Sequence, residues 1–501
     1  MTTDPVPSPP ATHRLFVNGG WREGGDGSYP VVNPSTEQVV GHAPEASAAD
    51  VEAAVAAARE AFDSWSRTGA AERAAVLNRV ADALLARNDE FVPLLQAETG
   101  ATIRVASSMQ VPVAAERFRR YARGALEAAV TPLAPYPVAA TPLAAGGLTS
   151  AVAVRRPVGV VGCITSYNFP IVNLAGKLAP ALAMGNTVVA KPAPQDPLGC
   201  LKLGEVFEDA GAPPGIFNVV TGSGAATGAA LVASAEVDMI SFTGSTAVGR
   251  RIAADGGHTM KRMLLELGGK GAGIVLEDAD LRTAVPAIGS AWAFHSGQIC
   301  TAPTRALVHE SRYEEVVAGL ARYAAALAVG DPLSPSTVVG PVITALHRDR
   351  IESYIAGAAA EGARLVAGGT RKEHTADSPA LPGTGFYVAP TLLAEVTPGM
   401  AVAREEVFGP VVVVIPFRDE EEAVAIANAT DFGLYDYVFS ADTARAYALA
   451  ARLRTGNVGI NTAQRHPETP FGGFKQSGVG RDGGSYGLSA YSELQSLVWQ
   501  S

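Results

Sequence analysis

The chain has 501 residues, of which 48% are apolar, and its formal net charge is -10 at pH 7. This length accommodates two large domains and a smaller appendage. The acidic balance, without a Lys/Arg cluster, excludes a nucleic-acid-binding surface. Three widely separated cysteines exclude a disulfide framework and favour a reducing, cytoplasmic location. We identify no signal peptide, no membrane span and no cluster of metal ligands, so we expect neither a membrane partner nor a metal.

The first segments are a tail and two helices. Residues 1–13 are polar and rich in proline, which predicts a disordered tail. Apolar residues recur at three-to-four spacing over residues 47–65, and Ser47 with Asp50 is typical of a helix N-terminus. A second helix is expected near residues 71–87.

From Pro157 onward, short β-branched runs alternate with helix-like stretches. The runs are VGVVGCI (158–164), NTVVAK (186–191), FNVV (217–220), VDMISF (237–242) and MLLELG (263–268). Continuously apolar strands that alternate with helices indicate βαβ units. The right-handed crossover rule then predicts an α/β fold with a doubly wound parallel sheet.

A second alternation begins near residue 271 and predicts a second α/β domain. Its strands are expected at GIVL (273–276), RALVH (305–309), VVVVIPF (411–417) and GNVGIN (456–461). The Pro/Ala/Gly-rich stretch 131–148 fits neither domain, and the tail 489–501 has the pattern of an edge strand. Each is either an oligomer contact or an exposed loop.

Cys300 differs from the other two cysteines in its surroundings. Cys163 lies in an apolar strand and Cys200 among apolar helix residues, as structural cysteines do. Cys300 ends FHSGQIC (294–300), where small and polar neighbours leave room for a ligand and for backbone N–H groups. A thiolate at such a turn is a plausible nucleophile, and a buried structural cysteine is the alternative.

Glu266 is the candidate base for this thiol. It lies in the apolar run LLELGG, directly before two glycines. Burial of an unpaired carboxylate raises its pKa and makes it a usable general base. A structural, ion-paired glutamate is the alternative.

Two glycine-rich turns compete as the dinucleotide site. GSGAATG (222–228) and FTGSTAVG (242–249) each follow a strand, and the N–H groups of the second open a helix toward a pyrophosphate. Neither fits the usual fingerprint. Lys191, at the end of its strand, is either a ribose or phosphate contact or a solvated surface lysine.

Seven ordered motifs make the chain resemble the aldehyde dehydrogenase superfamily from about residue 14 to the C-terminus. They are SYNFP (166–170), KPAPQDP (191–197), FTGSTAVGR (242–250), LELGGK (265–270), GQIC (297–300), EEVFGPV (405–411) and PFGGFKQSGVGR (470–481). The resemblance implies a hydrolytic, NAD(P)-dependent oxidation of an aldehyde to a carboxylic acid.

The resemblance also implies residue roles. Cys300 matches the nucleophile, Glu266 the base, Asn168 the oxyanion donor and Lys177 a lysine near the base. The residues expected to contact the cofactor are Ile164, Thr165, Tyr167, Lys191, Pro194, Gly224, Gly228, Phe242, Gly244, Ser245, Val248, Gly249, Leu267, Gly268, Glu406 and Phe408. Those expected around the substrate are Asn173, Gly176, Phe294, Thr301, Arg465 and Phe471.

The resemblance further implies a domain division and a homodimer or homotetramer. The dinucleotide-binding domain is expected at 14–130 and 152–267, the catalytic domain at 268–470, and oligomerisation segments at 131–151 and 471–501.

The chain departs from the family pattern at several of these positions. Pro194 stands where many members carry a glutamate that repels a 2′-phosphate, so NAD is expected and NADP remains open. Gly176 and Asn173 replace bulkier residues, which predicts a wider, partly polar substrate tunnel. Arg465 and His466 lie near its mouth, either to attract a polar aldehyde or as solvated loop residues.

Three alternatives to a hydrolytic aldehyde dehydrogenase stay open at this point. A coenzyme A-acylating member is disfavoured by Glu266, and a catalytically silent member by the retention of Cys300, Glu266 and Asn168. A cysteine hydrolase is disfavoured by the absence of a Cys–His–Asn pattern. The sequence leaves undefined which aldehyde is oxidised and what His295 and Ser296 do.

Overall fold

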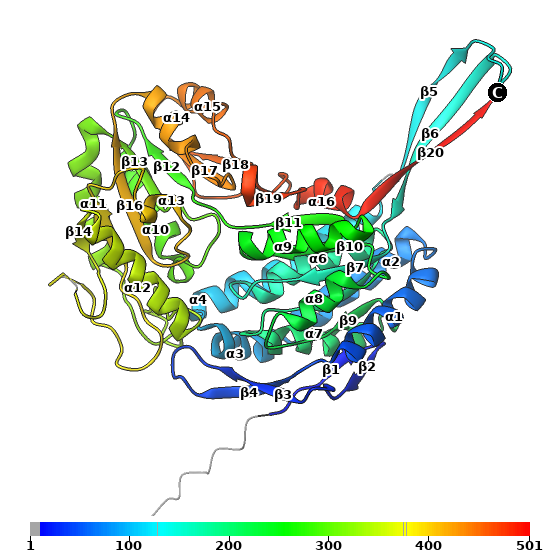
Figure 1. The fold of residues 1–501 in the computed structure, drawn as a ribbon, viewed down its shortest axis with the longest axis horizontal. Helices are drawn as coiled ribbons and strands as arrows, with labels where there is room; N and C mark the ends of the chain where they lie inside the picture. The colour runs from blue at the N-terminus through cyan, green and yellow to red at the C-terminus, as the bar shows by residue number, and fades with distance from the viewer. Residues whose placement is uncertain (1–10, 128, 374, 377, 501) are drawn as a thin grey trace, which may run out of the picture.

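Four sheets organise the chain in the computed structural model, which describes residues 11–127, 129–373, 375–376 and 378–500 (Figure 1). An eight-stranded and a seven-stranded sheet each form a helix-covered body, a three-stranded sheet projects as an arm, and a two-stranded sheet joins β3 (Ser28–Val32) to β4 (Val39–Pro44). Most of the expected tail, residues 1–10, lies outside the described residues.

The eight-stranded sheet contains all five strands predicted between residues 158 and 268. Its order is β19-β11-β10-β7-β8-β9-β1-β2. The strands β7 to β11 run parallel to their neighbours, and the flanking strands β1, β2 and β19 pair antiparallel. The bounds are β1 Leu15–Val17, β2 Gly20–Arg22, β7 Val160–Ile164, β8 Thr187–Lys191, β9 Phe217–Val219, β10 Met239–Thr243, β11 Arg262–Glu266 and β19 Gly478–Val479.

Helices cover both faces of this sheet, which is why β7 and β8 are buried at every residue. The first predicted helix is α1 (Ala48–Trp65), and Ser47 and Asp50 close a reciprocal capping box at its start. The second is α2 (Ala70–Ala86). The others are α3 Asn88–Thr99, α5 Val111–Ala125, α6 Pro170–Ala183, α7 Pro197–Asp209, α8 Ala226–Ala233 and α9 Thr246–Gly256.

The seven-stranded sheet has the order β14-β15-β16-β13-β12-β17-β18 and contains the four strands predicted after residue 271. Its strands are β12 Ala272–Val275, β13 Arg305–His309, β14 Arg364–Ala367, β15 Thr391–Ala394, β16 Val411–Phe417, β17 Tyr435–Phe439 and β18 Asn457–Ile460. Its helices include α10 Leu281–Ala293, α11 Tyr313–Ala325, α12 Ala345–Ala360, α14 Glu420–Asn428 and α15 Thr443–Ala450. Both sheets together confirm the expected α/β fold with parallel-sheet domains.

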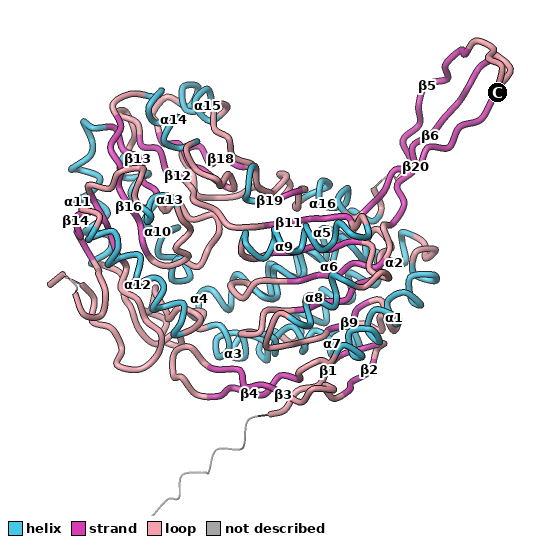
Figure 2. The backbone as a smooth tube through the Cα atoms, in the orientation of Figure 1, coloured by secondary structure: helices cyan, strands magenta, loops and turns pink. Residues whose placement is uncertain are grey.

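The arm consists of β5 (Val130–Val138), β6 (Gly147–Pro157) and β20 (Ser492–Gln500), with β6 in the middle. It extends away from the two bodies (Figures 1 and 2). The tail is therefore an edge strand, as its pattern predicted, and every residue of β5 is exposed.

Among the described residues, no helix is long and apolar enough to cross a bilayer. The same part of the chain contains no group of three or more His, Cys, Asp or Glu side chains that could hold a metal ion.

Candidate active site

The carboxyl ends of four parallel strands form one edge of the first sheet. The strand register pairs Ile164 of β7 with Lys191 of β8 and with Phe242 of β10, and it pairs Thr243 of β10 with Glu266 of β11. Residues that are up to 102 positions apart in sequence therefore lie in one row. Ligands of open α/β sheets bind at this edge.

A sharp turn brings Cys300 toward this edge from the second body. Helix α10 ends at Ala293, and His295, Ser296 and Gly297 follow with φ of 48°, 58° and 71°. Three successive left-handed residues reverse the chain within one turn. A side chain at Gly297 would overlap the backbone of Gly409, so only glycine fits there.

His295 and Ser296 hold this turn in place through contacts with other segments, so both residues have a structural role. The Ser296 hydroxyl donates a hydrogen bond to the Gly340 carbonyl oxygen at 2.8 Å. The His295 ring packs against the Phe169 ring with centroids 5.1 Å apart. Burial lowers the pKa of His295 to about 4, so the ring is neutral and serves as packing.

Gly269 is the point of contact between Cys300 and the strand that carries Glu266. A side chain at Gly269 would overlap the Cys300 carbonyl oxygen, and one at Gly268 would overlap the Glu406 carboxylate. The two glycines after Glu266 therefore allow two other segments to approach the end of β11.

Glu266 is buried, and neither of its carboxylate oxygens has a hydrogen-bond partner among the described residues. Burial raises its pKa to about 8, and the negative charge of Asp482 adds to the rise, while Lys177 and Arg465 oppose it. An unpartnered carboxyl of this pKa can accept a proton near neutral pH.

The Cys300 side chain is half-buried, and desolvation raises the pKa of its thiol to about 12. The positive charge of Arg465 opposes this rise. At neutral pH the sulfur is therefore a thiol, and it needs a base to become a nucleophile.

Asn168 lies in the loop between β7 and α6, beside the Cys300 turn. Its Nδ2 donates to the Gln298 carbonyl oxygen at 2.9 Å, and its Oδ1 accepts from Ser166 Oγ at 2.9 Å and from Asn173 Nδ2 at 3.1 Å. An amide nitrogen has two protons, and the second finds no acceptor among the described residues. Asn173, expected near the substrate, thus orients Asn168.

Lys177 lies on α6 and is almost fully buried. Its Nζ donates to Ser241 Oγ at 3.2 Å, and that hydroxyl lies 2.8 Å from Tyr491 Oη. Burial lowers the pKa of Lys177, and the charges of Asp482 and Glu266 counter the change. Asp482, which directly follows the motif 470–481, is a charged neighbour of Glu266 that the sequence did not reveal.

Lys191 is buried, and its ammonium makes no hydrogen bond or ion pair with any described residue. Burial lowers its pKa to about 8, and Glu45 and Asp196 oppose the shift. The Glu45 carboxylate accepts from the Ser223 N–H at 2.9 and 3.1 Å. A negative charge from a remote segment thus lies near Lys191, although the neighbouring Pro194 has none.

The turn FTGSTAVG opens helix α9. Ser245 is its N-cap and accepts from the Val248 N–H at 3.4 Å, while Val248 itself is 47% exposed. Gly244 donates its N–H to the Glu266 carbonyl oxygen at 3.1 Å. A side chain at Gly249 would overlap Leu267, so this glycine lets the helix pack closely on the end of β11.

The competing turn GSGAATG leads into α8. Its Gly224 and Gly228 have no other atom within 4 Å of the position a Cβ would take. Both therefore face open space, which leaves room for a ligand beside α8. Thr165, on the adjacent loop, donates its N–H to the Lys191 carbonyl oxygen at 3.2 Å.

Glu406 and Phe408 follow α13 (Ala401–Arg404). Glu406 accepts from the Gly269 N–H at 2.9 Å, and burial raises its pKa to about 7. The Phe408 ring meets Tyr167 at a centroid distance of 5.9 Å, and the carbonyl oxygen of Phe408 lies 2.8 Å from His347 Nε2. His347 was not predicted from the sequence, because it comes from α12.

The remaining substrate candidates are spread over three segments. Phe294 stacks on Phe169 with centroids 6.3 Å apart. The Thr301 carbonyl oxygen accepts from Tyr437 Oη at 2.9 Å. The Arg465 guanidinium carbon lies 3.9 Å from the centroid of the Phe471 ring.

The expected widening at Gly176 does not leave free space. A side chain there would overlap the guanidinium of Arg117 from helix α5. The position is therefore polar, as the tunnel hypothesis had it, but an arginine fills it.

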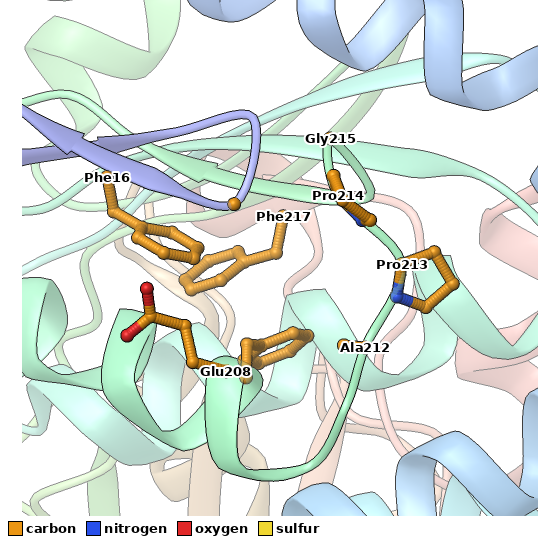
Figure 3. Close-up of a pocket in the computed structure, with 9 residues that line it drawn as sticks. Phe16, Glu208, Ala212, Pro213, Pro214, Gly215 and Phe217 are labelled. Carbon is orange, nitrogen blue, oxygen red and sulfur yellow. The ribbon is translucent and has the colours of Figure 1, made fainter.

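A separate hollow of about 240 Å³ lies between α7, the start of β9 and the N-terminal strands, where Phe16, Phe217 and Pro214 line it (Figure 3). It contains none of the predicted site residues.

Comparisons with known proteins agree with the motifs. The model of the aldehyde dehydrogenase family matches residues 21–497. A betaine aldehyde dehydrogenase of Cereibacter sphaeroides is 41% identical over 98% of this chain and 97% of its own. A 3-succinoylsemialdehyde-pyridine dehydrogenase of Pseudomonas is 38% identical over 97% and 98%.

Solved structures show the same fold with a bound cofactor. An aldehyde dehydrogenase C mutant of Pseudomonas syringae, in complex with NAD+ and octanal, has a TM-score of 0.90 at 40% identity and covers 97% of this chain and 96% of its own. A betaine aldehyde dehydrogenase of Staphylococcus aureus with NAD+ has a TM-score of 0.91 at 33% identity, with 97% of both chains covered.

Proposed function

The chain belongs to the aldehyde dehydrogenase family, and on that premise we propose that Cys300, Glu266 and Asn168 oxidise an aldehyde to its carboxylic acid with NAD+ as the electron acceptor. The protein is an NAD-dependent oxidoreductase that acts on aldehydes. The proposal concerns which of its residues do the chemistry and how.

One observation supports the proposal most strongly. The Cys300 carbonyl oxygen lies too close to the position that a Cβ of Gly269 would take, so only glycine fits there. The strand that ends in Glu266 and the turn that ends in Cys300 are therefore in direct contact, with the row of cofactor candidates on the adjoining strands.

In the first step, Glu266 takes the proton of the Cys300 thiol, and the sulfur forms a bond to the aldehyde carbon. The carbonyl π pair moves to oxygen and gives a thiohemiacetal anion. The raised pKa of Glu266 favours this proton transfer, whereas the raised pKa of the thiol opposes it.

Asn168 is placed to stabilise the resulting oxyanion. Its free amide proton, together with the Cys300 backbone N–H, supplies two donors. Each such donor contributes about 3 kcal/mol to the transition state in other oxyanion holes. The hydrogen bonds to Ser166 and Asn173 hold the amide oxygen and so aim the nitrogen.

The residues present fit a dinucleotide. Lys191 is a buried ammonium without a described partner, Gly224 and Gly228 face open space, and α9 offers its N-terminus at the sheet edge. Ile164, Thr165, Glu406 and Phe408 would complete its surroundings. When bound, NAD+ accepts the hydride of the former aldehyde carbon and so converts the adduct to a thioester.

Before the last step, Glu266 releases the proton of the thiol to solvent. It then accepts a proton from water, whose oxygen attacks the thioester carbon. The C–S bond breaks, the sulfur leaves as the thiolate of Cys300, and the acid departs. The absence of hydrogen-bond partners on both Glu266 oxygens among the described residues leaves them available to such a water.

The quaternary arrangement and location belong to the same proposal. The arm, which overlaps the expected segments 131–151 and 471–501, would join copies into a homodimer or homotetramer in the cytoplasm. The proposed cofactor domain comprises residues 14–130 and 152–267, and the catalytic domain residues 268–470.

The test is NADH formation with a panel of aldehydes, for the wild type and Cys300→Ser. We expect the substitution to reduce kcat by at least about a thousandfold, because a serine hydroxyl is a poorer nucleophile, while NAD+ binding by tryptophan fluorescence is unchanged. Equal activity of the two proteins would refute the role of Cys300. Parallel assays with NADP+ and with added coenzyme A would detect the alternative cofactor and the acylating alternative.

A further inference from the structure

We propose that the enzyme selects aldehydes that carry a carboxylate at their far end, and that the guanidinium groups of Arg117 and Arg465 recognise this carboxylate. The inference rests on the proposed function, because it takes Cys300 as the reacting centre. It adds a substrate class and two specificity-determining residues.

Arg117 reaches the site from helix α5 and occupies the space that the absent side chain of Gly176 leaves. Its Nη1 donates to the Val172 carbonyl oxygen at 3.2 Å, and it forms no ion pair with any described residue. Arg120, on the same helix, differs, because it pairs with Glu127 at 3.0 Å and Glu468 at 2.5 Å. Arg117 is therefore a half-buried cation with unused donors.

Arg465 reaches the site from the loop after β18. Its guanidinium lies over the face of Phe471 at 3.9 Å, which holds it in place by a cation–π contact. It has no hydrogen bond and no ion pair with any described residue. Its positive charge acts on both Cys300 and Glu266 and lowers the pKa of each, so it lies close to the reacting groups.

Asp482 connects the two arginines. Its backbone pairs with that of Phe471 through hydrogen bonds of 2.6 and 2.7 Å. Its carboxylate lies 3.3 Å from the position that a Cβ of Gly176 would take, the same position that Arg117 blocks. Arg117, beside Gly176, and Arg465, on Phe471, thus belong to one neighbourhood around the active site.

The charges of this neighbourhood favour an anion. Glu266 is mostly protonated at pH 7 because its pKa is about 8. Asp482 is one negative charge, and it already accepts from the Gly483 N–H at 2.7 Å and from Tyr121 Oη at 3.4 Å. Arg117 and Arg465 oppose it, Lys177 and Arg481 are further cations near Glu266, and Glu406 is a further carboxyl near Cys300.

A carboxylate is the group that matches guanidinium donors best. Arginine presents a planar fork of N–H groups that binds both oxygens of a carboxylate at once. An aldehyde with a distal carboxylate could place its carbonyl at Cys300 and its anionic end between the arginines. A neutral aldehyde of the same length would offer neither guanidinium group an anionic partner.

The experiment compares matched substrates, succinate semialdehyde against butanal and adipate semialdehyde against hexanal. Wild-type kcat/KM is expected to be higher for at least one semialdehyde than for its neutral partner. Arg117→Met and Arg465→Met should each raise KM for that semialdehyde by about 10- to 100-fold, as the loss of a charged hydrogen-bonding partner does. The loss of kcat/KM should be smaller for the neutral aldehyde than for the semialdehyde of the same length.

Three controls keep the outcome interpretable. Arg119→Met removes an arginine of the same helix that pairs with Asp82 on the surface. It should change kcat/KM for neither the semialdehyde nor the neutral aldehyde. Arg117→Lys retains the charge and should recover part of the semialdehyde preference. Added NaCl should raise KM for the semialdehyde and leave that for the neutral aldehyde unchanged.

Two results would overturn the inference. One is a wild-type enzyme that prefers both neutral aldehydes over their matched semialdehydes. The other is an equal loss for both substrates in Arg117→Met and Arg465→Met, which would make these arginines structural. Failure of the proposed function itself looks different, because then Cys300→Ser would retain activity with every aldehyde.

Discussion

At the scale of single residues, the two side chains that we propose to react both hold a proton at neutral pH. Glu266 and Cys300 both have raised pKa values, about 8 and about 12, because each is desolvated. A carboxyl with a pKa near 8 can take a proton from a thiol or a water and release it again close to neutral pH. Burial, together with the absence of hydrogen-bond partners among the described residues, therefore keeps the pKa of Glu266 close to neutral pH.

The pKa of Glu266 predicts how hydrolysis depends on pH. The carboxylate form is the base, so the rate of thioester hydrolysis should rise with pH up to about 8 and level off above it. Below pH 7 the rate should fall about tenfold per pH unit, in proportion to the ionised fraction. Single-turnover and steady-state kinetics from pH 5.5 to 9.5 measure this profile.

Glu266→Gln should remove the dependence on pH and slow both NADH formation, because the thiol loses its base, and thioester hydrolysis. A variant that keeps the inflection near pH 8 would assign it to another group. Asp482→Asn is the matched control: it removes the neighbouring negative charge and should lower the inflection by favouring the ionised form of Glu266.

The sequence revealed those candidate residues that their immediate neighbours in the chain mark as unusual. Cys300 stands among small and polar residues, and Glu266 stands in an apolar strand before two glycines, so both could be identified. Arg117 and Asp482 could not, because their positions depend on packing between segments far apart in the chain. The collision between Gly176 and Arg117 is visible only in three dimensions.

At the scale of elements, the turn between α10 and Cys300 matters most. Three consecutive left-handed residues are rare, because each non-glycine residue there costs about 1 kcal/mol or more. His295 and Ser296 occupy this conformation and are held by Phe169 and by the Gly340 carbonyl. The turn therefore places the nucleophile at the expense of local backbone strain.

Gly297→Ala should destabilise the folded enzyme by at least about 3 kcal/mol, because the new methyl group meets backbone that cannot move aside. Gly211→Ala is the control: its φ is also positive, at 57°, but no atom lies within 4 Å. That change should cost only about 1 kcal/mol. Thermal and urea unfolding measure both, and equal costs would show that the Gly409 contact is unimportant.

Two of the strands that were not predicted from the sequence, β17 and β5, lack a continuous apolar run. The strand β17 contains Asp436, whose carboxylate accepts from the Ala272 N–H at 2.6 Å. This buried charge interrupts the apolar run that marks the other central strands. The strand β5 contains Pro132, Pro135 and Pro137, which argue against a strand except at a sheet edge, where β5 lies.

At the scale of the whole molecule, the arm exposes several large apolar side chains. Leu494 and Val498 of β20 are 68% and 62% exposed, and Leu133 and Tyr136 of β5 are 54% and 70% exposed. Apolar side chains gathered on a projecting sheet are typical of a contact between copies.

Charges placed on this surface should dissociate the oligomer. Leu494→Asp with Val498→Asp puts two carboxylates on one face of β20, and their desolvation cost opposes any apolar contact. Light scattering after gel filtration should show a smaller species than the wild type. Ser489→Asp, on the exposed side of α16 (Gly484–Ala490), is the control and should not change the mass. An unchanged mass for the double variant would exclude the arm as the contact.

The pairing of β6 with β20 also sets the order in which the molecule can be made. Arg156 and Gln495, hydrogen-bonded at 2.9 Å, are 339 positions apart. A ribosome that adds about 5 to 20 residues per second needs roughly tens of seconds to travel that distance. During this time the hairpin of β5 and β6 has left the ribosome, but the edge of β6 that pairs with β20 has no partner strand. The arm is therefore completed only after the residues of β20, Ser492–Gln500, have been synthesised.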